Sequence, residues 1–209
     1  ELIGGNKVSV NSIATGYQNP HFVDPKPSYI INLSNADMFV TLGLDLEIGW
    51  SPQLLASSRN SKIQKGSDGY VDASIGIGLL QVPTSANRGE GDIHIFGNPH
   101  YWLDPLNGKV IARNIANGLE RVDPSNKSFY ENNLQAFFNN TDIKMRQWEG
   151  NMAAFRGTKI IAYHNVWVYF EIRFVFKIVV FMELKPGIPT TPSQLVKVIG
   201  EVKDNNIKV

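Results

Sequence analysis

The pattern of apolar and polar residues over the first 82 positions predicts strands that alternate with helices. Apolar and polar side chains alternate at the start as in a half-buried strand, and Pro at a first helical position marks helix starts further on. Strand and helix in alternation predict an α/β fold. The expected elements are a strand at 7–13, a helix from Asp24-Pro25 to about Ala36, a strand at 38–43, a helix opening at Ser51-Pro52, a Gly/Ser/Asp-rich segment at 65–78 and a strand at 78–82.

Two helices are expected in the middle of the chain. Asp104 is a good N-cap and Pro105 a good first helical residue, which predicts a helix to about Arg121. Asp123-Pro124 repeats this start signal, and apolar residues then recur at threes and fours to about Phe155. At about 1.5 Å per residue the second helix would be roughly 45 Å long. A helix of this length can join two lobes.

The last third of the chain returns to the strand and helix alternation. A strand is expected at 158–163, and His164 lies immediately beyond its carboxyl end, where open α/β sheets place their ligands. After it we expect a helix, a strand at 177–182, a Pro/Gly loop at 185–192, a helix from about Pro192 to Asp204 and the start of a strand at 206–209.

Composition and charge exclude several classes of function. The formal net charge is +1 with no run of Lys or Arg, so nucleic acid is not expected as a partner. The absence of cysteine excludes thiolate metal ligands and disulfides. The longest apolar stretch, 166–182, contains three charged residues, Glu171, Arg173 and Lys177, which argues against a membrane span.

Three of the four histidines, His21, His100 and His164, lie in loops or at the end of a strand. Neutral imidazole is the commonest protein ligand for zinc and also suits Mn, Fe, Cu and Ni. The separations of 79 and 64 residues match no local metal motif, so spacing alone leaves two interpretations open, one joint metal site or three unrelated loop histidines. The fourth histidine, His94, is expected to be a solvated loop residue that could act as a substitute ligand.

Four segments of the sequence resemble the metal-binding substrate-binding proteins of bacterial zinc and manganese ABC importers. Three of these segments each contain one histidine of the trio, and the fourth follows the third ligand in that family. In order they are Tyr-Gln-Asn-Pro-His-Phe-Val-Asp-Pro-Lys-Pro-Ser at 17–28, Gly-Asn-Pro-His-Tyr-Trp-Leu-Asp-Pro at 97–105, Ala-Tyr-His-Asn-Val-Trp-Val-Tyr-Phe at 162–170 and Lys-Pro-Gly-Ile-Pro at 185–189.

This resemblance implies two α/β lobes bridged by one long helix, with a metal in the cleft between the lobes. His21 and His100 would be ligands from the first lobe and His164 from the second. The expected divisions are a metal-binding lobe at 1–122, the bridging helix at 123–156 and an incomplete second lobe at 157–209. The family also has a strand before the position of Glu1 and a fourth ligand, usually Asp or Glu, beyond the position of Val209, so we expect three ligands from this chain.

The function implied by the resemblance is metal transport without enzymatic activity. We expect a periplasmic or surface-anchored lipoprotein, monomeric, that captures Zn²⁺, with Mn²⁺ and Fe²⁺ as alternatives, and delivers it to an ABC permease. The rival hypothesis is a zinc-dependent hydrolase whose three histidines leave one position for an activated water. It needs a general base, and the only acids at suggestive offsets, Asp24 and Asp104, are better explained as helix caps.

Overall fold

The computed structural model describes residues 1–83, 95–183 and 189–207 of the chain, and these residues form two compact units. Unit 1 comprises Glu1–Ile77 and Leu106–Asp142, and unit 2 comprises Gly78–Pro105 and Ile143–Val209. The longest helix, α4 (Lys127–Met152), begins in unit 1 and ends in unit 2. The segment 78–105, which carries His100, therefore groups with the second half of the chain. The lobe boundaries expected from the sequence stay a prediction.

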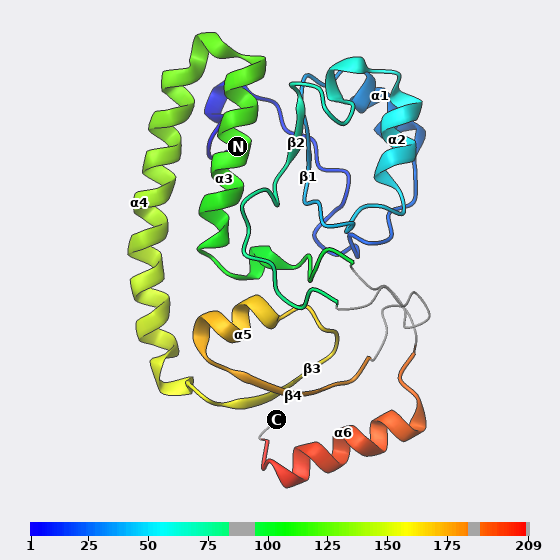
Figure 1. Cartoon of the computed structure of the whole chain (residues 1–209), viewed down its shortest axis with the longest axis vertical. Coiled ribbons are helices and arrows are strands. Elements are labelled where there is room, and N and C mark those ends of the chain that lie inside the picture. The colour runs from blue at the N-terminus through cyan, green and yellow to red at the C-terminus, as the bar shows by residue number, and fades with distance from the viewer. Residues whose placement is uncertain (84–94, 184–188, 208–209) are drawn as a thin grey trace. The chain divides into compact units, whose positions relative to one another are not determined.

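Unit 1 is built around two short parallel strands, β1 (Phe39–Thr41) and β2 (Tyr70–Asp72). In Figure 1 these strands lie between α3 (Asn107–Val122) and the pair α1 (Pro27–Ser34) and α2 (Ser51–Ser58). One apolar cluster fills the α1–α2 side, and another joins α3 to the first half of α4. The second cluster includes fully buried Leu134 of α4. Each helix thus buries one apolar face against the unit's core.

Unit 2 contains a second parallel pair, β3 (Lys159–Ala162) and β4 (Lys177–Phe181). The connecting helix α5 (Val168–Phe174) and the last helix α6 (Pro192–Asp204) lie on opposite sides of this pair (Figure 1). The described residues also contain short single-turn helices. They are η1 (Gly5–Lys7), η2 (Ser61–Ile63), η4 (Tyr101–Leu103), η5 (Pro124–Asn126) and η6 (Ala153–Phe155).

The α/β class, the long helix and most elements are confirmed. The last helix has the bounds expected for it, Pro192–Asp204, because Thr191 accepts from the Gln194 N–H at 3.2 Å and Pro192 occupies the first helical position. The structure describes no helix that is long and apolar enough to cross a membrane. The strand start expected at 206–209 lies largely outside the described residues.

Two expected strands are wrong. Residues 8–12 belong to no strand, although Val8 has extended backbone angles, because no second strand pairs with them in the described part of the chain. Residues 78–82 also form no strand. Gln81 has a φ of 53°, which interrupts extended backbone, and the N–H of Leu80 donates to the Tyr169 hydroxyl at 3.2 Å instead of to a strand. The strand that unit 1 does use, β2, lies in the Gly/Ser/Asp-rich segment 65–78, where no strand was expected.

The two expected aspartate caps are also corrected. Helix α1 begins at Pro27, with Lys26 rather than Asp24 before it, and α3 begins at Asn107 without a side-chain cap. The Asp104 carboxylate accepts two hydrogen bonds from Arg173 of α5, from Nε at 2.8 Å and from an Nη at 2.7 Å. Bidentate pairs of this kind are among the stronger hydrogen-bonded contacts of a carboxylate. Asp104 therefore fixes the loop after His100 to α5.

Candidate metal centre

The first two histidines of the trio share the tripeptide Asn-Pro-His. The side-chain oxygen of Asn19 accepts a hydrogen bond from the N–H of His21 at 3.0 Å, and the side-chain oxygen of Asn98 accepts one from the N–H of His100, also at 3.0 Å. Asparagine commonly holds the N–H two residues ahead in this way, and the intervening proline restricts the backbone further. The local sequence thus fixes the backbone at both histidines.

His21 lies in unit 1, in the turn that follows this Asn-Pro pair, and its side chain is buried. Trp50, at the start of α2, donates its indole N–H to the Pro20 carbonyl at 2.9 Å. Because Trp50 is itself buried in the α1–α2 cluster, it ties the His21 turn to the core of unit 1. The position of His21 therefore depends on packing as well as on its own turn.

His100 lies in unit 2, and its hydrogen bond to Asn98 determines which ring nitrogen carries the proton. The Asn98 amide can have only one orientation, because its oxygen faces the N–H of His100 and its nitrogen faces the carbonyl of Asn165 at 3.0 Å. The same oxygen lies 2.9 Å from Nδ1 of His100, so Nδ1 must be the protonated nitrogen. Nε2 is then the unprotonated nitrogen, which is the form of imidazole nitrogen that binds a metal.

A small network of amides joins the loop of His100 to the loop of His164. Asn98 Nδ2 also donates to the side-chain oxygen of Gln81 at 2.9 Å, and Asn165, the residue after His164, donates to the same oxygen at 3.0 Å. The Tyr169 hydroxyl of α5 donates to the backbone carbonyl of Asn98 at 3.0 Å. These bonds restrict the separation of the two histidine loops within unit 2.

His164 lies two residues beyond the end of β3, near the carboxyl end of the strand as the sequence predicts, and its side chain meets a carboxylate there. Its Nδ1 lies 3.1 Å from Oε2 of Glu183, and both side chains are largely buried, 21% and 11% exposed. A carboxylate can only accept here, so it also favours a proton on Nδ1 and a lone pair on Nε2. Both histidines of unit 2 therefore present the same kind of metal ligand.

The imidazoles of His100 and His164 lie side by side in unit 2. Their ring centroids are 5.8 Å apart with planes at 81°, and a ring nitrogen of one lies within 4.8 Å of a ring nitrogen of the other. Two imidazoles bound to one zinc ion at about 2.0–2.1 Å have nitrogens roughly 3–4 Å apart. The two ring nitrogens are therefore close enough to be candidate ligands of one ion.

The structure thus brings together two of the three predicted ligands in one unit. His21 belongs to the other unit, and its participation stays a prediction. His94 lies outside the described residues, as does most of the expected family segment at 185–189. Sequence reasoning missed Asn98 and Glu183 as partners of the ligands. Asn98 could have been inferred from the repeated Asn-Pro-His, whereas no local signal connects Glu183 with His164.

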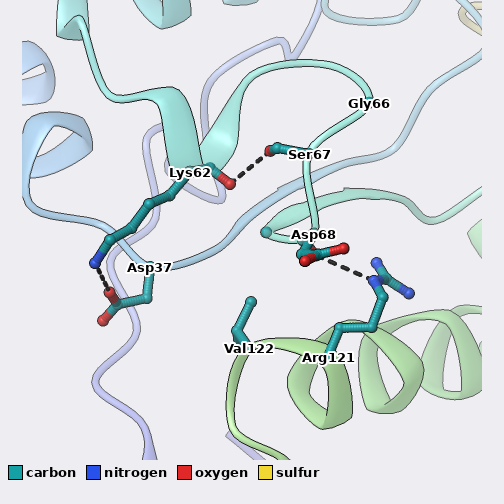
Figure 2. Close-up of a pocket in the computed structure, with 8 residues that line it drawn as sticks. Asp37, Lys62, Gly66, Ser67, Asp68, Arg121 and Val122 are labelled. Carbon is teal, nitrogen blue, oxygen red and sulfur yellow. Dashed lines mark hydrogen bonds and ion pairs between the residues drawn. The ribbon is translucent and has the colours of Figure 1, made fainter.

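A hollow on unit 1 is separate from this pair. It is lined by the turn at 66–69 and by the end of α3, and no histidine lines it. Figure 2 shows its two cations directed at protein oxygens. Lys62 pairs with Asp37 at 2.8 Å, and Arg121 donates to the backbone carbonyl of Asp68 at 3.1 Å. Among the described residues, the hollow therefore contains no group of three side chains that could hold a metal ion.

The model of one protein family, zinc-uptake complex component A (ZnuA), periplasmic, matches residues 1–209 of the chain. The chain belongs to this family. A crystal structure of ZnuA superposes with a TM-score of 0.80 at 29% identity, and the match covers 98% of this chain and 74% of that one. The ZnuA family therefore accounts for the fold.

Curated relatives of this ZnuA-family chain include lipoproteins of metal transporters. The manganese ABC transporter substrate-binding lipoprotein PsaA of Streptococcus pneumoniae is 27% identical over 208 residues, 98% of this chain and 64% of that protein. The iron ABC transporter substrate-binding lipoprotein MtsA of Streptococcus pyogenes serotype M1 is 28% identical over 205 residues, 97% of this chain and 64% of that protein. The chain thus spans about 64% of the length of these relatives.

Proposed function

We propose that the chain is the metal-capturing part of a receptor for an ABC importer and that one divalent transition metal binds to His21, His100 and His164. The observation that carries this proposal is the pair in unit 2. Two imidazoles lie with ring nitrogens within 4.8 Å, and each has a partner on Nδ1 that leaves Nε2 as the ligand atom. His21 supplies the third ligand from the first Asn-Pro-His turn, at residues 19–21.

The donor set favours Zn²⁺ as the cargo. Three neutral imidazoles bind Zn²⁺ more tightly than Mn²⁺ or Fe²⁺, because affinity at nitrogen sites follows the Irving–Williams order. They leave one coordination position of a tetrahedral ion for water or for another ligand. The names of the relatives include manganese and iron, so the test below compares Zn²⁺ with Mn²⁺ directly.

Capture and delivery explain the site better than hydrolysis. A hydrolase needs a general base, and Asp104, one of the two acids considered for that role, accepts hydrogen bonds from two nitrogens of Arg173. The other acid, Asp24, is exposed in unit 1. The named relatives are substrate-binding lipoproteins, so we place this chain outside the cytoplasm, on the membrane surface or in the periplasm, with an ABC permease as its partner.

Competition with a chromophoric chelator tests the site directly. The wild-type chain should bind one Zn²⁺ more tightly than Mn²⁺. His21→Ala, His100→Ala and His164→Ala should each lower zinc affinity by more than 100-fold, since even the loss of a residue behind a ligand costs about 10–100-fold. His94→Ala is the matched control and should bind zinc like the wild type.

The outcomes separate the two parts of the proposal. If the wild type binds no zinc, or if all four variants bind equally well, the metal site is wrong. If His21→Ala alone is unaffected, the pair in unit 2 binds metal without unit 1. If the zinc-loaded chain hydrolyses test esters or peptides at a rate that His100→Ala abolishes, the function is catalytic and the receptor proposal fails.

A further inference from the structure

The parallel pairing of β3 and β4 places Glu183 beside His164. Ala162 pairs with Phe181 at the end of the sheet, and the chain continues the ladder beyond both strands. The N–H of Met182 donates to the Ala162 carbonyl at 2.9 Å, and the N–H of Glu183 donates to the Tyr163 carbonyl at 2.7 Å. These bonds hold the backbone of Glu183 next to the residue before His164.

The side chains then meet away from bulk water. The carboxylate of Glu183 is 11% exposed, and its Oε2 lies 3.1 Å from Nδ1 of His164. In this surrounding of low polarity a hydrogen bond to an ionised carboxylate is stronger than one to a neutral acceptor. Glu183 lies 19 positions after His164 in the sequence. Their contact therefore depends on the pairing of β3 with β4 and could not be predicted from the local sequence.

The two histidines of unit 2 differ in the charge of their partners. Nδ1 of His100 faces the neutral amide oxygen of Asn98, whereas Nδ1 of His164 faces a carboxylate. A carboxylate behind an imidazole fixes its tautomer and makes the other nitrogen a stronger donor to a metal. His164 should therefore be the stronger of the two metal ligands.

We propose that Glu183 is a positioning residue for cargo binding, which keeps His164 in the Nδ1–H tautomer and strengthens Nε2 as a metal ligand. This inference rests on the proposed function for the metal itself, but the tautomer belongs to the metal-free protein. A contact between Glu183 and His164 that served stability alone would leave zinc affinity unchanged in a variant that still folds. A change of tautomer together with a fall in zinc affinity therefore distinguishes positioning from a purely structural role.

The experiment compares wild type, Glu183→Gln, Glu183→Ala and the control Glu201→Gln. Glu201 is a carboxylate of α6 that accepts from the Asn205 side chain at 2.9 Å and has no contact with a histidine among the described hydrogen bonds and ion pairs. Two-bond ¹H–¹⁵N spectra of the metal-free proteins at pH 8 report the tautomer of each neutral imidazole. Chelator competition then gives the zinc affinity.

We expect His164 to be the Nδ1–H tautomer in the wild type and in Glu201→Gln, and a mixture of tautomers in Glu183→Ala. Zinc affinity should fall by about 10–100-fold in Glu183→Ala. It should fall less in Glu183→Gln, which keeps a neutral acceptor and the side-chain volume. Glu201→Gln should bind zinc like the wild type.

The inference is overturned if His164 keeps the same tautomer, or zinc the same affinity, in Glu183→Ala. Thermal unfolding of each variant identifies a folding defect, and Glu183→Gln retains the test if Glu183→Ala does not fold. A wild type that binds no zinc would refute the proposed function, while the spectra would still show whether Glu183 controls the tautomer. Normal zinc binding by both Glu183 variants would refute only the role of Glu183.

Discussion

The side-chain amide of Asn98 is buried, and its two ends contact different parts of unit 2. Its oxygen faces His100, and its nitrogen donates to Gln81 and to the Asn165 carbonyl. Asn98→Ala removes both the amide oxygen and the amide nitrogen. The buried or partly buried groups that they contact, including Nδ1 of His100 and the Asn165 carbonyl, then lose these hydrogen bonds. We expect a loss of about 2 kcal/mol in unfolding free energy, together with a fall of about 10–100-fold in zinc affinity.

Thermal unfolding and chelator competition measure these two effects. Asn139→Ala is the control, because Asn139 is exposed on α4 and accepts only from Gln135 among the described hydrogen bonds. It should change the unfolding free energy by less than about 0.5 kcal/mol and leave zinc affinity unchanged. Unchanged zinc affinity in Asn98→Ala would show that Asn98 has no part in holding His100.

Glu47 provides a test of pH dependence in unit 1. Its carboxylate is buried and accepts from the Thr41 hydroxyl at 2.8 Å and from the Leu42 N–H at 2.6 Å. Burial raises the pKa of Glu47 above its ordinary value of 4.5, although these hydrogen bonds act in the opposite direction. The folded chain therefore holds this proton more tightly than the unfolded chain.

The sign of the effect follows from the raised pKa. The stability that Glu47 contributes is fully present below its unfolded pKa and is lost as the pH rises through its folded pKa. We expect the unfolding free energy of the wild type, minus that of Glu47→Gln, to decrease as the pH is raised from about 4 towards neutral. Urea unfolding at a series of pH values measures this difference. A difference that is flat or that increases with pH would contradict the prediction.

At the level of single residues, the sequence identified the histidines as candidate ligands but not the residues that hydrogen-bond to them. His21 and His100 could be selected because each lies beside a proline in an irregular segment, although the structure buries both side chains. Glu183 could not be selected, because it reaches His164 only through the pairing of β3 with β4. Arg173 could not be selected as a partner of Asp104 for the same reason, since the two residues are 69 positions apart.

Among the elements, helices were predicted better than strands because their signals are local. Helix α6 has its cap and its proline at its own start, and its bounds were predicted correctly. A strand requires a partner, and three-residue strands such as β2 leave almost no periodicity. Residues 8–12 alternate between apolar and polar as a strand does, but no described strand pairs with them. By contrast, β2 pairs with β1 although its sequence shows no such alternation.

The packing of α3 on β2 gives a prediction at the scale of the element. A Cβ on Gly118 would overlap Cγ2 of Val71 and would lie 3.0 Å from the sulfur of Met38. Gly118→Ala gains about 1 kcal/mol of helix propensity, but overpacking of this kind costs about 1–3 kcal/mol. Because Val71 is buried and lies in a strand, we expect a net loss of stability of roughly 1 kcal/mol.

Gly200→Ala in α6 is the matched control, because a Cβ there meets nothing within 4 Å. It should increase the unfolding free energy by up to about 1 kcal/mol. Urea unfolding of both variants gives the comparison. Equal stabilisation by the two alanines would mean that α3 does not approach β2 as closely as described.

At the scale of the whole molecule, the proposed ligands come from both units. His100 and His164 belong to unit 2, while the His21 turn belongs to unit 1 and is tied to its core by Trp50. An ion that binds only the folded state stabilises the segments that must be folded for binding. The gain is about 2.7 kcal/mol when the free ion concentration is 100 times Kd. A shared ion must therefore stabilise segments of both units together.

Amide hydrogen exchange with and without zinc can detect this coupling. We expect zinc to slow exchange by up to about 100-fold in segments 97–105 and 163–166 of unit 2 and also in segment 18–23 of unit 1. In His21→Ala the effect on segment 18–23 should disappear. Protection confined to unit 2 in the wild type would show that zinc is held by His100 and His164 without His21. Protection in both units that depends on His21 would mean that the metal makes the stability of each unit depend on the other.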